Sequence, residues 1–412
     1  MTKIKINTDR VGEVSSETIT IDSKAGKPMH LATPSINGIR KFSDDGPEYV
    51  ISKIHPMTEA MQVLIEPKRK IKIVWTSMHN CIRVIKLSKA LQKTGRYEIH
   101  GIASQVSYGT EGFDAFSFYH DSKQFEKLIQ TLPADIYIHS NEPNWQANRI
   151  RSNKPDAKII LDGHDFDSIR MNALPIDEMR AFTSCDGFLF VSKEVEQFIK
   201  KLHIDQIGDK PSAVIEHYCN EEWHKLPQSP INQRHGLVYE GGMQSPPYKN
   251  KINAFWQLYP VFKQLVEQGN EVHLFAGNAD AQSTYANIGA FVYQPKVYPE
   301  LMASLRTKKY GLCVFNNPKF DQKQVNITRT NKEQEYLACG LPIIVFGAPA
   351  TAEYVKKHDI GLVFDRLEDI SPKILETEYS RVKENVDKLM PTLTMESHIH
   401  ILEKLINDIL EN

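Results

Sequence analysis

One stretch of the sequence reads Arg329-Thr330-Asn331-Lys332-Glu333-Gln334-Glu335-Tyr336-Leu337-Ala338-Cys339-Gly340-Leu341-Pro342 and continues directly into Ile343-Ile344-Val345-Phe346. Thr330 with Glu333 three residues later forms a capping-box pattern, and Gly340 followed by Pro342 is typical of the end of a helix. The four apolar residues that come next predict a buried strand. The stretch therefore predicts a short helix leading into a strand, which is one step of an alternating α/β fold.

The start of this predicted helix has the chemistry of an anion site. Unpaired N–H groups and the positive end of the helix dipole favour a diphosphate, and Arg329 and Lys332 add full positive charge there. Glu335, one turn further along, has two oxygens that can accept hydrogen bonds from neighbouring hydroxyls such as those of a ribose. The simpler alternative is a capped helix whose charges face water.

The motif Lys332-x-x-Glu335-Tyr336-Leu337-Ala338-x-Gly340-x-Pro342 resembles the donor-site signature of the family 4 retaining glycosyltransferases, which have the GT-B fold. The resemblance implies that the helix start, with Thr330, Asn331 and Lys332, binds the diphosphate of a nucleotide sugar, and that Glu335 binds its ribose. Many members carry a second acidic residue eight positions before this glutamate, where the present chain has Ile327. In that respect the chain resembles the subgroup that keeps only Lys-x-x-Glu-Tyr.

Length and composition indicate a globular protein of two or three domains, with 412 residues, 41% hydrophobic and 25% charged. Lys and Arg (50) balance Asp and Glu (51), so the net charge gives no pull toward nucleic acid or anionic lipid. Five scattered cysteines show no metal-ligand spacing, and no run of about 20 apolar residues predicts a membrane span. Without a visible secretory signal, the sequence predicts a cytoplasmic protein with reduced thiols and without a metal site.

Strands and helical periodicity divide the chain into successive parts. Residues 1–68 are predicted to form an N-terminal extension, and alternating strands and helices over 69–220 predict a first Rossmann-like domain. The polar segment 221–235 is interpreted as a linker, 236–385 as a second Rossmann-like domain, and 386–412 as helices that, by resemblance, cross back to the first domain. The predicted fold class is α/β, with two doubly wound parallel-sheet domains facing a cleft, as in GT-B.

A glycine pair after the first predicted strand of the second domain offers another phosphate contact. Gly242 lets a phosphate approach the backbone, while Lys249 and Lys251 supply charge at the start of the following segment. The family often has an arginine directly after this glycine, where the chain has Met243, so Arg329 is a candidate substitute. A glycine turn followed by solvated lysines is an equal alternative.

Histidines at strand ends of the first domain are the candidates for proton transfer or hydroxyl binding. His79 follows the first strand, and His164-Asp165 resembles a His-Asp pair that in the family lies near the donor sugar or the acceptor. A lone histidine at a strand end is more often a hydrogen-bonded structural residue, so both interpretations stay open.

These features predict a retaining glycosyltransferase of the hexosyl- or pentosyltransferase class that uses a nucleotide-diphosphate sugar and requires no cofactor. The acceptor is not identified by the sequence, and nucleic acid stays among the candidates together with glycans, lipid-linked sugars, proteins and small molecules. One alternative is a sugar-nucleotide epimerase or hydrolase of the same fold. Another is a non-catalytic partner subunit in which Ile327 and Met243 mark a decayed site. No oligomeric state is predicted.

Overall fold

The computed structural model describes the backbone of residues 2–5, 19–22, 28–31, 49–57 and 60–67, and then residues 69–170, 174–247, 256–276, 279–316, 323–327 and 329–411. The chain forms two compact units, one comprising Met1–Ile71 with Thr94–Glu98 and the other comprising Lys72–Lys93 with Ile99–Asn412. The candidate site lies in the second unit. The predicted domain boundaries remain predictions.

The first unit contains two small antiparallel sheets. One has the order β1-β5-β4, and the other pairs β2 with β3. Their bounds are β1 (Thr2–Lys5), β2 (Ile19–Asp22), β3 (Pro28–Leu31), β4 (Tyr49–Met57) and β5 (Ala60–Pro67).

The second unit contains a seven-stranded sheet in the order β12-β11-β10-β9-β6-β7-β8, apart from Ile71 and Tyr97–Glu98 at the starts of two of its strands. Parallel pairing joins β12 to β11, β11 to β10, β10 to β9, β9 to β6 and β7 to β8. All residues of β9, β10 and β11 are buried, as expected for parallel strands that helices cover on both faces. The strands are β6 (Ile71–Thr76), β7 (Tyr97–Ala103), β8 (Ala115–Phe118), β9 (Ile136–Ser140), β10 (Ile159–Gly163), β11 (Gly187–Phe190) and β12 (Ser212–Val214).

A second, six-stranded parallel sheet has the order β15-β14-β13-β16-β17-β18. Its two faces carry separate cores: Leu237 and Tyr239 of β13 pack in one cluster, whereas Val238 between them packs in the other. The strands are β13 (His235–Gly241), β14 (Val272–Ala276), β15 (Phe291–Tyr293), β16 (Lys308–Val314), β17 (Ile343–Phe346) and β18 (Gly361–Val363).

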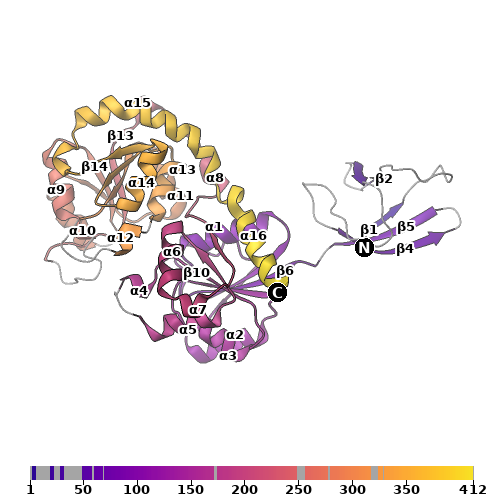
Figure 1. The fold of residues 1–412 in the computed structure, drawn as a ribbon. Helices are drawn as coiled ribbons and strands as arrows, with labels where there is room; N and C mark the ends of the chain where they lie inside the picture. Colours follow the sequence, from indigo (N-terminus) through magenta and orange to yellow (C-terminus); the bar gives the residue numbers. More distant parts are fainter. Residues whose placement is uncertain are drawn as a thin grey trace. The chain divides into compact units, whose positions relative to one another are not determined.

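Helices cover both sheets (Figure 1). Those of the first domain are α1 (Ile82–Lys93), α2 (Ser122–Thr131), α3 (Trp145–Asn153), α4 (Asp167–Arg170), α5 (Ile176–Ser184), α6 (Lys193–Leu202) and α7 (Ile204–Ile207). Those that follow are α8 (Glu221–His224), α9 (Tyr259–Glu267), α10 (Ala279–Ala286), α11 (Tyr298–Leu305), α12 (Lys323–Ile327), α13 (Asn331–Ala338), α14 (Pro349–His358), α15 (Pro372–Leu389) and α16 (Met395–Glu411).

The strand orders determine where a ligand can bind. In each sheet the first strand, β6 or β13, has later strands on both sides, so the strand order reverses beside it. Helices diverge at such a switch point and leave a crevice at the carboxyl ends of the strands. In the second domain that crevice lies after Gly241, which ends β13.

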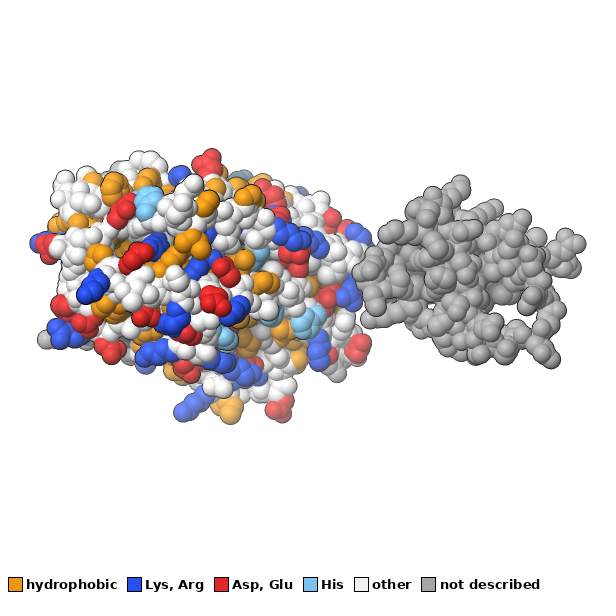
Figure 2. Space-filling model, turned by 90° about the horizontal axis from the view of Figure 1, so that it is seen from above, with side chains coloured by type: hydrophobic (Ala, Val, Ile, Leu, Met, Phe, Trp, Pro, Cys, Tyr) orange, Lys and Arg blue, Asp and Glu red, His pale blue; other side chains and the backbone are white. Residues whose placement is uncertain are grey.

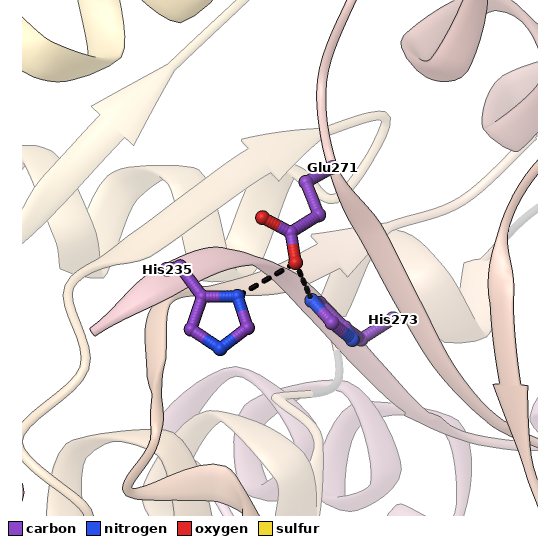
Figure 3. Close-up of side chains that lie close together, drawn as sticks. All are labelled: His235, Glu271 and His273. Carbon is purple, nitrogen blue, oxygen red and sulfur yellow. Dashed lines mark hydrogen bonds and ion pairs between the residues drawn. The ribbon is translucent and has the colours of Figure 1, made fainter. Parts of the chain in front are cut away.

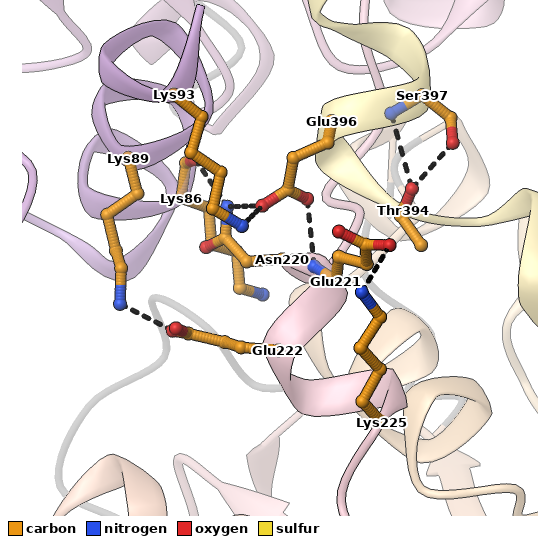
Figure 4. Close-up of polar contacts among 10 residues, drawn as sticks. All are labelled: Lys86, Lys89, Lys93, Asn220, Glu221, Glu222, Lys225, Thr394, Glu396 and Ser397. Atoms are coloured by element: carbon orange, nitrogen blue, oxygen red, sulfur yellow. Dashed lines mark hydrogen bonds and ion pairs between the residues drawn. The ribbon is translucent and has the colours of Figure 1, made fainter. Parts of the chain in front are cut away.

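The polypeptide passes between the two domains twice, at neighbouring places. Cys219, before α8, forms a β-bridge with Thr394, which directly precedes α16. Helix α16 then packs against α1 and against β11 and β12 of the first sheet. Figure 4 shows how polar contacts join the two passages, with Glu396 of α16 paired to Lys93 of α1 and accepting a hydrogen bond from the Glu221 backbone.

The surface carries mixed charge. Figure 2 shows Lys, Arg, Asp and Glu side chains interspersed on the face in view, in keeping with the balanced charge of the sequence. Among the described residues, the helices are all too short or too polar to cross a lipid bilayer.

Candidate functional site

A cavity of about 390 Å³ lies between the carboxyl ends of the two sheets. This volume is typical of pockets that bind small ligands. The first domain contributes Ile82, Tyr108, His164, Asp165, Arg170 and His217 to its wall, and the second contributes Glu240, Gly241, Gly242, Trp256, Tyr298, Leu301, Phe315, Val325, Arg329, Thr330, Asn331, Lys332 and Glu335. Most of the residues predicted as a donor site are therefore brought together.

Helix α13 begins at the cavity wall, as the sequence predicted for Asn331, and the backbone of Thr330 has the extended conformation of an N-cap residue. The predicted capping box is wrong, however, because the Thr330 side chain makes no capping hydrogen bond. The Glu333 carboxylate is instead bonded to Arg329. The Thr330 hydroxyl is therefore left at the cavity, beside the N–H end of the helix.

Lys332 places its ammonium group in an aromatic and glycine-lined part of the cavity. Its Nζ lies 4.9 Å from the centre of the Tyr239 ring and 5.7 Å from that of Phe315. A Cβ atom at Gly241 would lie 3.4 Å from Lys332 Cε, in van der Waals contact with this side chain. Burial alone would lower the pKa of Lys332, but Tyr239 and Glu240 raise it above the ordinary value, so the group stays charged.

Arg329 lines the same cavity, but its charge is already compensated. Its Nη1 lies 2.6 Å from Oε1 of Glu216, and its Nε donates to Oε1 of Glu333 at 2.8 Å. The guanidinium also stacks on Tyr354, 3.3 Å from the ring centre. Arg329 therefore links α13 to Glu216 of the first domain. The positive charge of Lys332 is less neutralised by carboxylate partners than that of Arg329.

Glu335 faces two partners that the sequence analysis did not identify. Lys86 of α1 lies 3.1 Å from its Oε1, and the Glu240 carboxyl group at the end of β13 interacts electrostatically with it. Burial alone would raise the pKa of Glu335, but Lys86 lowers it below the ordinary value. Burial, followed by the Glu335 charge, raises the pKa of Glu240 well above its usual range, so Glu240 is the protonated member of the pair.

Ile327 does not supply an acidic group to the cavity, and its surroundings explain the apolar residue. Its side chain packs against the hydrophobic core of the first domain, and its carbonyl oxygen accepts a hydrogen bond from the Ser192 hydroxyl at 3.3 Å. The carboxyl group next to Glu335 comes from Glu240, on a different element.

His164 and Asp165 form the first-domain side of the cavity. A single side chain orients them, because Asn141 Oδ1 accepts hydrogen bonds from the backbone N–H of His164 at 3.3 Å and of Asp165 at 2.7 Å. Asp165 is ion-paired with Arg170 at 2.8 Å. Burial alone would lower the pKa of His164, but the Cys81 thiol and the charges of Asp165 and Asp162 raise it.

The other predicted site residues are placed differently. Gly242 lines the cavity and lies under Trp256, whose ring a Cβ atom there would meet at 3.1 Å. His79 is not among the cavity-lining residues and forms a β-bridge with Gln105. Lys249 and Lys251 lie outside the described residues.

Five residues of the cavity wall have a buried polar atom without a hydrogen-bond partner among the described residues. These atoms are Nδ1 of His164, Nδ1 of His217, Oε1 of Glu240, Oγ1 of Thr330 and Oδ1 of Asn331. Buried polar groups are nearly always paired, so a cluster of exceptions calls for a specific explanation. A ligand rich in hydroxyl and N–H groups would satisfy them, and Lys332 would complement an anionic part of it.

Comparison with known structures identifies this architecture. A glycosyltransferase from Rickettsia africae ESF-5 superposes with a TM-score of 0.58 and 13% identity, over 84% of this chain and 100% of that one. An alpha-glucosyltransferase solved with UDP and a 13-mer DNA gives 0.57 and 11%, over 84% and 100%. The chain has the GT-B fold. The fold predicted from the sequence is thereby confirmed.

Sequence comparison agrees with this fold in the second domain. Residues 256–402 match the family described as "Glucosyltransferase 3-like, C-terminal domain". Over 96 residues the chain is 33% identical to Glucosyltransferase 3 of Streptococcus gordonii, an alignment that spans 22% of this chain and 28% of that relative. The matched part of the GT-B chain includes α13 and its motif.

Sequence reasoning missed Lys86, His217, Glu240 and Tyr298, all of which meet at the cavity or at Glu335. The sequence could have indicated Glu240 as a cavity residue, since it directly precedes the glycine pair at the end of the first strand of its domain. Lys86 had none, because it comes from a helix of the other domain, 249 positions before its partner.

Proposed function

We propose that this protein is a retaining glycosyltransferase, similar to those of family 4, that transfers a hexosyl or pentosyl group from a nucleotide-diphosphate sugar. The cluster of unpartnered polar atoms beside Lys332 and the start of α13 is the observation that carries this proposal. A nucleotide sugar combines a diphosphate for the helix start with hydroxyls for the surrounding acceptors. Retention and family membership rest on the Lys332-x-x-Glu335-Tyr336 motif.

In the proposed complex the diphosphate lies against the N–H groups of Thr330, Asn331 and Lys332, and the Lys332 ammonium stabilises charge that develops on the leaving group. Glu335, together with Glu240, accepts hydrogen bonds from ribose hydroxyls. Uridine is the first nucleotide to test, because the alpha-glucosyltransferase of the same fold was solved with UDP. Arg329 supports α13 through its two carboxylate partners and has a minor direct part.

The first-domain side of the cavity would hold the transferred sugar and the acceptor. The raised pKa of His164 keeps a proton available for a hydrogen bond to a sugar hydroxyl, and Asp165 is held by Arg170 beside it. The acceptor is an alcohol of unidentified class, with nucleic acid among the candidates.

The free cysteines, four of them buried, favour the reducing conditions of the cytoplasm as the working compartment.

The test is calorimetric binding of UDP, GDP and dTDP and of their sugars to the wild type and to Lys332→Ala. We expect one nucleotide series to bind the wild type, and we expect Lys332→Ala to weaken it by roughly tenfold or more, since a charge-assisted contact is lost. Lys404→Ala on α16, an exposed lysine paired with Asp408, is the matched control and should bind as the wild type does. Equal affinity in the wild type and Lys332→Ala, or no nucleotide binding at all, would refute the proposal.

The stereochemistry can be tested once a donor is found. The anomeric configuration of the product, followed by proton NMR during turnover, should match that of the donor sugar. Release of a free epimerised sugar nucleotide in the absence of any acceptor would instead identify an epimerase.

A further inference from the structure

A second cluster of polar side chains lies at the opposite end of β13, far from the cavity. His235 begins β13, Glu271 directly precedes the neighbouring β14, and His273 is the second residue of β14 (Figure 3). Oε1 of Glu271 lies 2.6 Å from Nδ1 of His235 and 2.8 Å from Nε2 of His273. The three atoms all lie within 4.8 Å of one another and converge on one point.

The structure fixes His273 in one orientation. Its side chain is 2% exposed, and its ring stacks with those of Phe291 and Tyr293 at interplanar angles of 20° and 15°. The Tyr293 hydroxyl lies 2.9 Å from Nδ1 and so fixes the nitrogen that faces away from Glu271. A Cβ atom at Gly236 would lie 2.7 Å from Nε2, so glycine is needed there to leave this nitrogen accessible.

We infer that His235, Glu271 and His273 bind a divalent transition-metal ion, with Zn²⁺ as the expected occupant. Two imidazole nitrogens and one carboxylate oxygen form a set that zinc prefers, and the Tyr293 hydroxyl can accept a hydrogen bond from the far nitrogen of His273 when the near one binds a metal. Ligands of one tetrahedral zinc ion lie about 3.3 Å apart, so the side chains must open slightly. His235 and Glu271, 52% and 38% exposed, are free to do so.

Lys308 opposes the ion and therefore provides a test of its position. Its Nζ lies 3.2 Å from Nδ1 and 3.4 Å from Nε2 of His273, so its charge would repel a cation bound between the three ligands. Removal of this charge must tighten metal binding if the ion sits where we place it. A metal bound elsewhere on the protein would be insensitive to Lys308.

The ion would have a structural rather than a catalytic role. Glu240 at the cavity follows His235 by five residues of strand, which is about 17 Å. Bound between the starts of β13 and β14, the ion would cross-link these two neighbouring strands of the second sheet. The inference is independent of the proposed sugar transfer, and each can fail without the other.

The experiment is a titration of the full chain, freed of any purification tag and treated with a chelator, with Co²⁺ and then Zn²⁺. We expect the visible absorption of a four-coordinate Co²⁺ site to saturate at one equivalent and to disappear as Zn²⁺ replaces it. His235→Ala should weaken binding by roughly tenfold or more. His400→Ala, at another exposed histidine outside the cluster, is the control and should bind as the wild type does.

The melting temperature provides a second measure of metal binding that does not depend on the visible absorption of Co²⁺. Zn²⁺ should raise the melting temperature of the wild type and of His400→Ala but not that of His235→Ala. Lys308→Met should bind Co²⁺ more tightly than the wild type. Absence of saturable binding at one equivalent, equal affinity in His235→Ala, or no gain in Lys308→Met would each overturn the inference. A thiolate-type spectrum retained by His235→Ala would place the metal at cysteine instead.

Discussion

The ammonium group of Lys86 lies 3.1 Å from the Glu335 carboxylate, and both side chains are almost completely buried. Lys86 belongs to α1 of the first domain, whereas Glu335 belongs to the helix at which we propose that the donor binds. This ion pair therefore joins the two domains at the base of the cavity. It also leaves Glu335 negatively charged when no ligand is present, since the lysine lowers its pKa.

Loss of this lysine should be costly. Lys86→Met leaves the Glu335 charge buried without its partner, and we expect the first transition in urea unfolding to lose about 3–5 kcal/mol. Lys89→Met, on the same helix, removes a partly exposed partner of Glu222 and should cost less than about 1 kcal/mol. Similar losses of unfolding free energy in the two variants would show that the buried ion pair stabilises the protein no more than the surface pair does.

The carboxyl pair of Glu240 and Glu335 predicts a dependence of stability on pH. Because burial and Glu335 raise the pKa of Glu240 above the ordinary 4.5, the folded protein retains a proton that the unfolded chain releases. The Glu240 contribution to stability must therefore fall as pH rises from 4.5 toward the raised pKa.

Glu240→Gln removes this proton linkage while keeping the shape of the side chain. We expect its stability relative to the wild type to increase as the pH is raised from about 4 to about 8, measured by urea unfolding at each pH. A stability difference that does not change over that range would mean that Glu240 titrates normally.

Alanine substitutions at Gly241 and Gly269 separate the effect of backbone strain from the effect of a new methyl group in the cavity. Both have positive φ, 121° and 82°, so alanine strains the backbone at either position and should cost about 1–2 kcal/mol. At Gly269 a Cβ atom meets nothing within 4 Å, whereas at Gly241 it approaches Lys332. We therefore expect Gly241→Ala to weaken nucleotide binding and Gly269→Ala to leave it unchanged. Calorimetry of the two variants side by side provides the check.

The sequence was sufficient for the fold because local patterns determine it. The four apolar residues from Ile343 to Phe346 form β17, whose first three residues are buried, and the helix predicted to begin at Asn331 does begin there. Alternation of such units gives two parallel sheets, since parallel strands need a crossover helix. None of this requires knowledge of long-range contacts.

The site was predictable only where its groups are local. One helix carries both Lys332 and Glu335, so their common place at the cavity could be predicted, and their roles stay predictions. The predicted bond between Thr330 and Glu333 is wrong, because Arg329 binds the same carboxylate. Lys86 could not be found, as its role depends on how the two domains dock. The cluster of His235, Glu271 and His273 escaped for a similar reason, since strand pairing brings together ligands 36 positions apart.

The β-bridge between Cys219 and Thr394 has a mechanical consequence. Because both passages of the chain between the domains run through this one point, and the Met395 N–H bonds the Cys219 carbonyl there at 2.9 Å, the domains cannot simply draw apart. The two domains can instead rotate relative to each other about an axis through the bridge, with the change in backbone torsion angles confined to a few residues there. The ion pairs of Lys86 with Glu335 and of Arg329 with Glu216 join the two domains close to this bridge, so a rotation that opens the cleft must also break them.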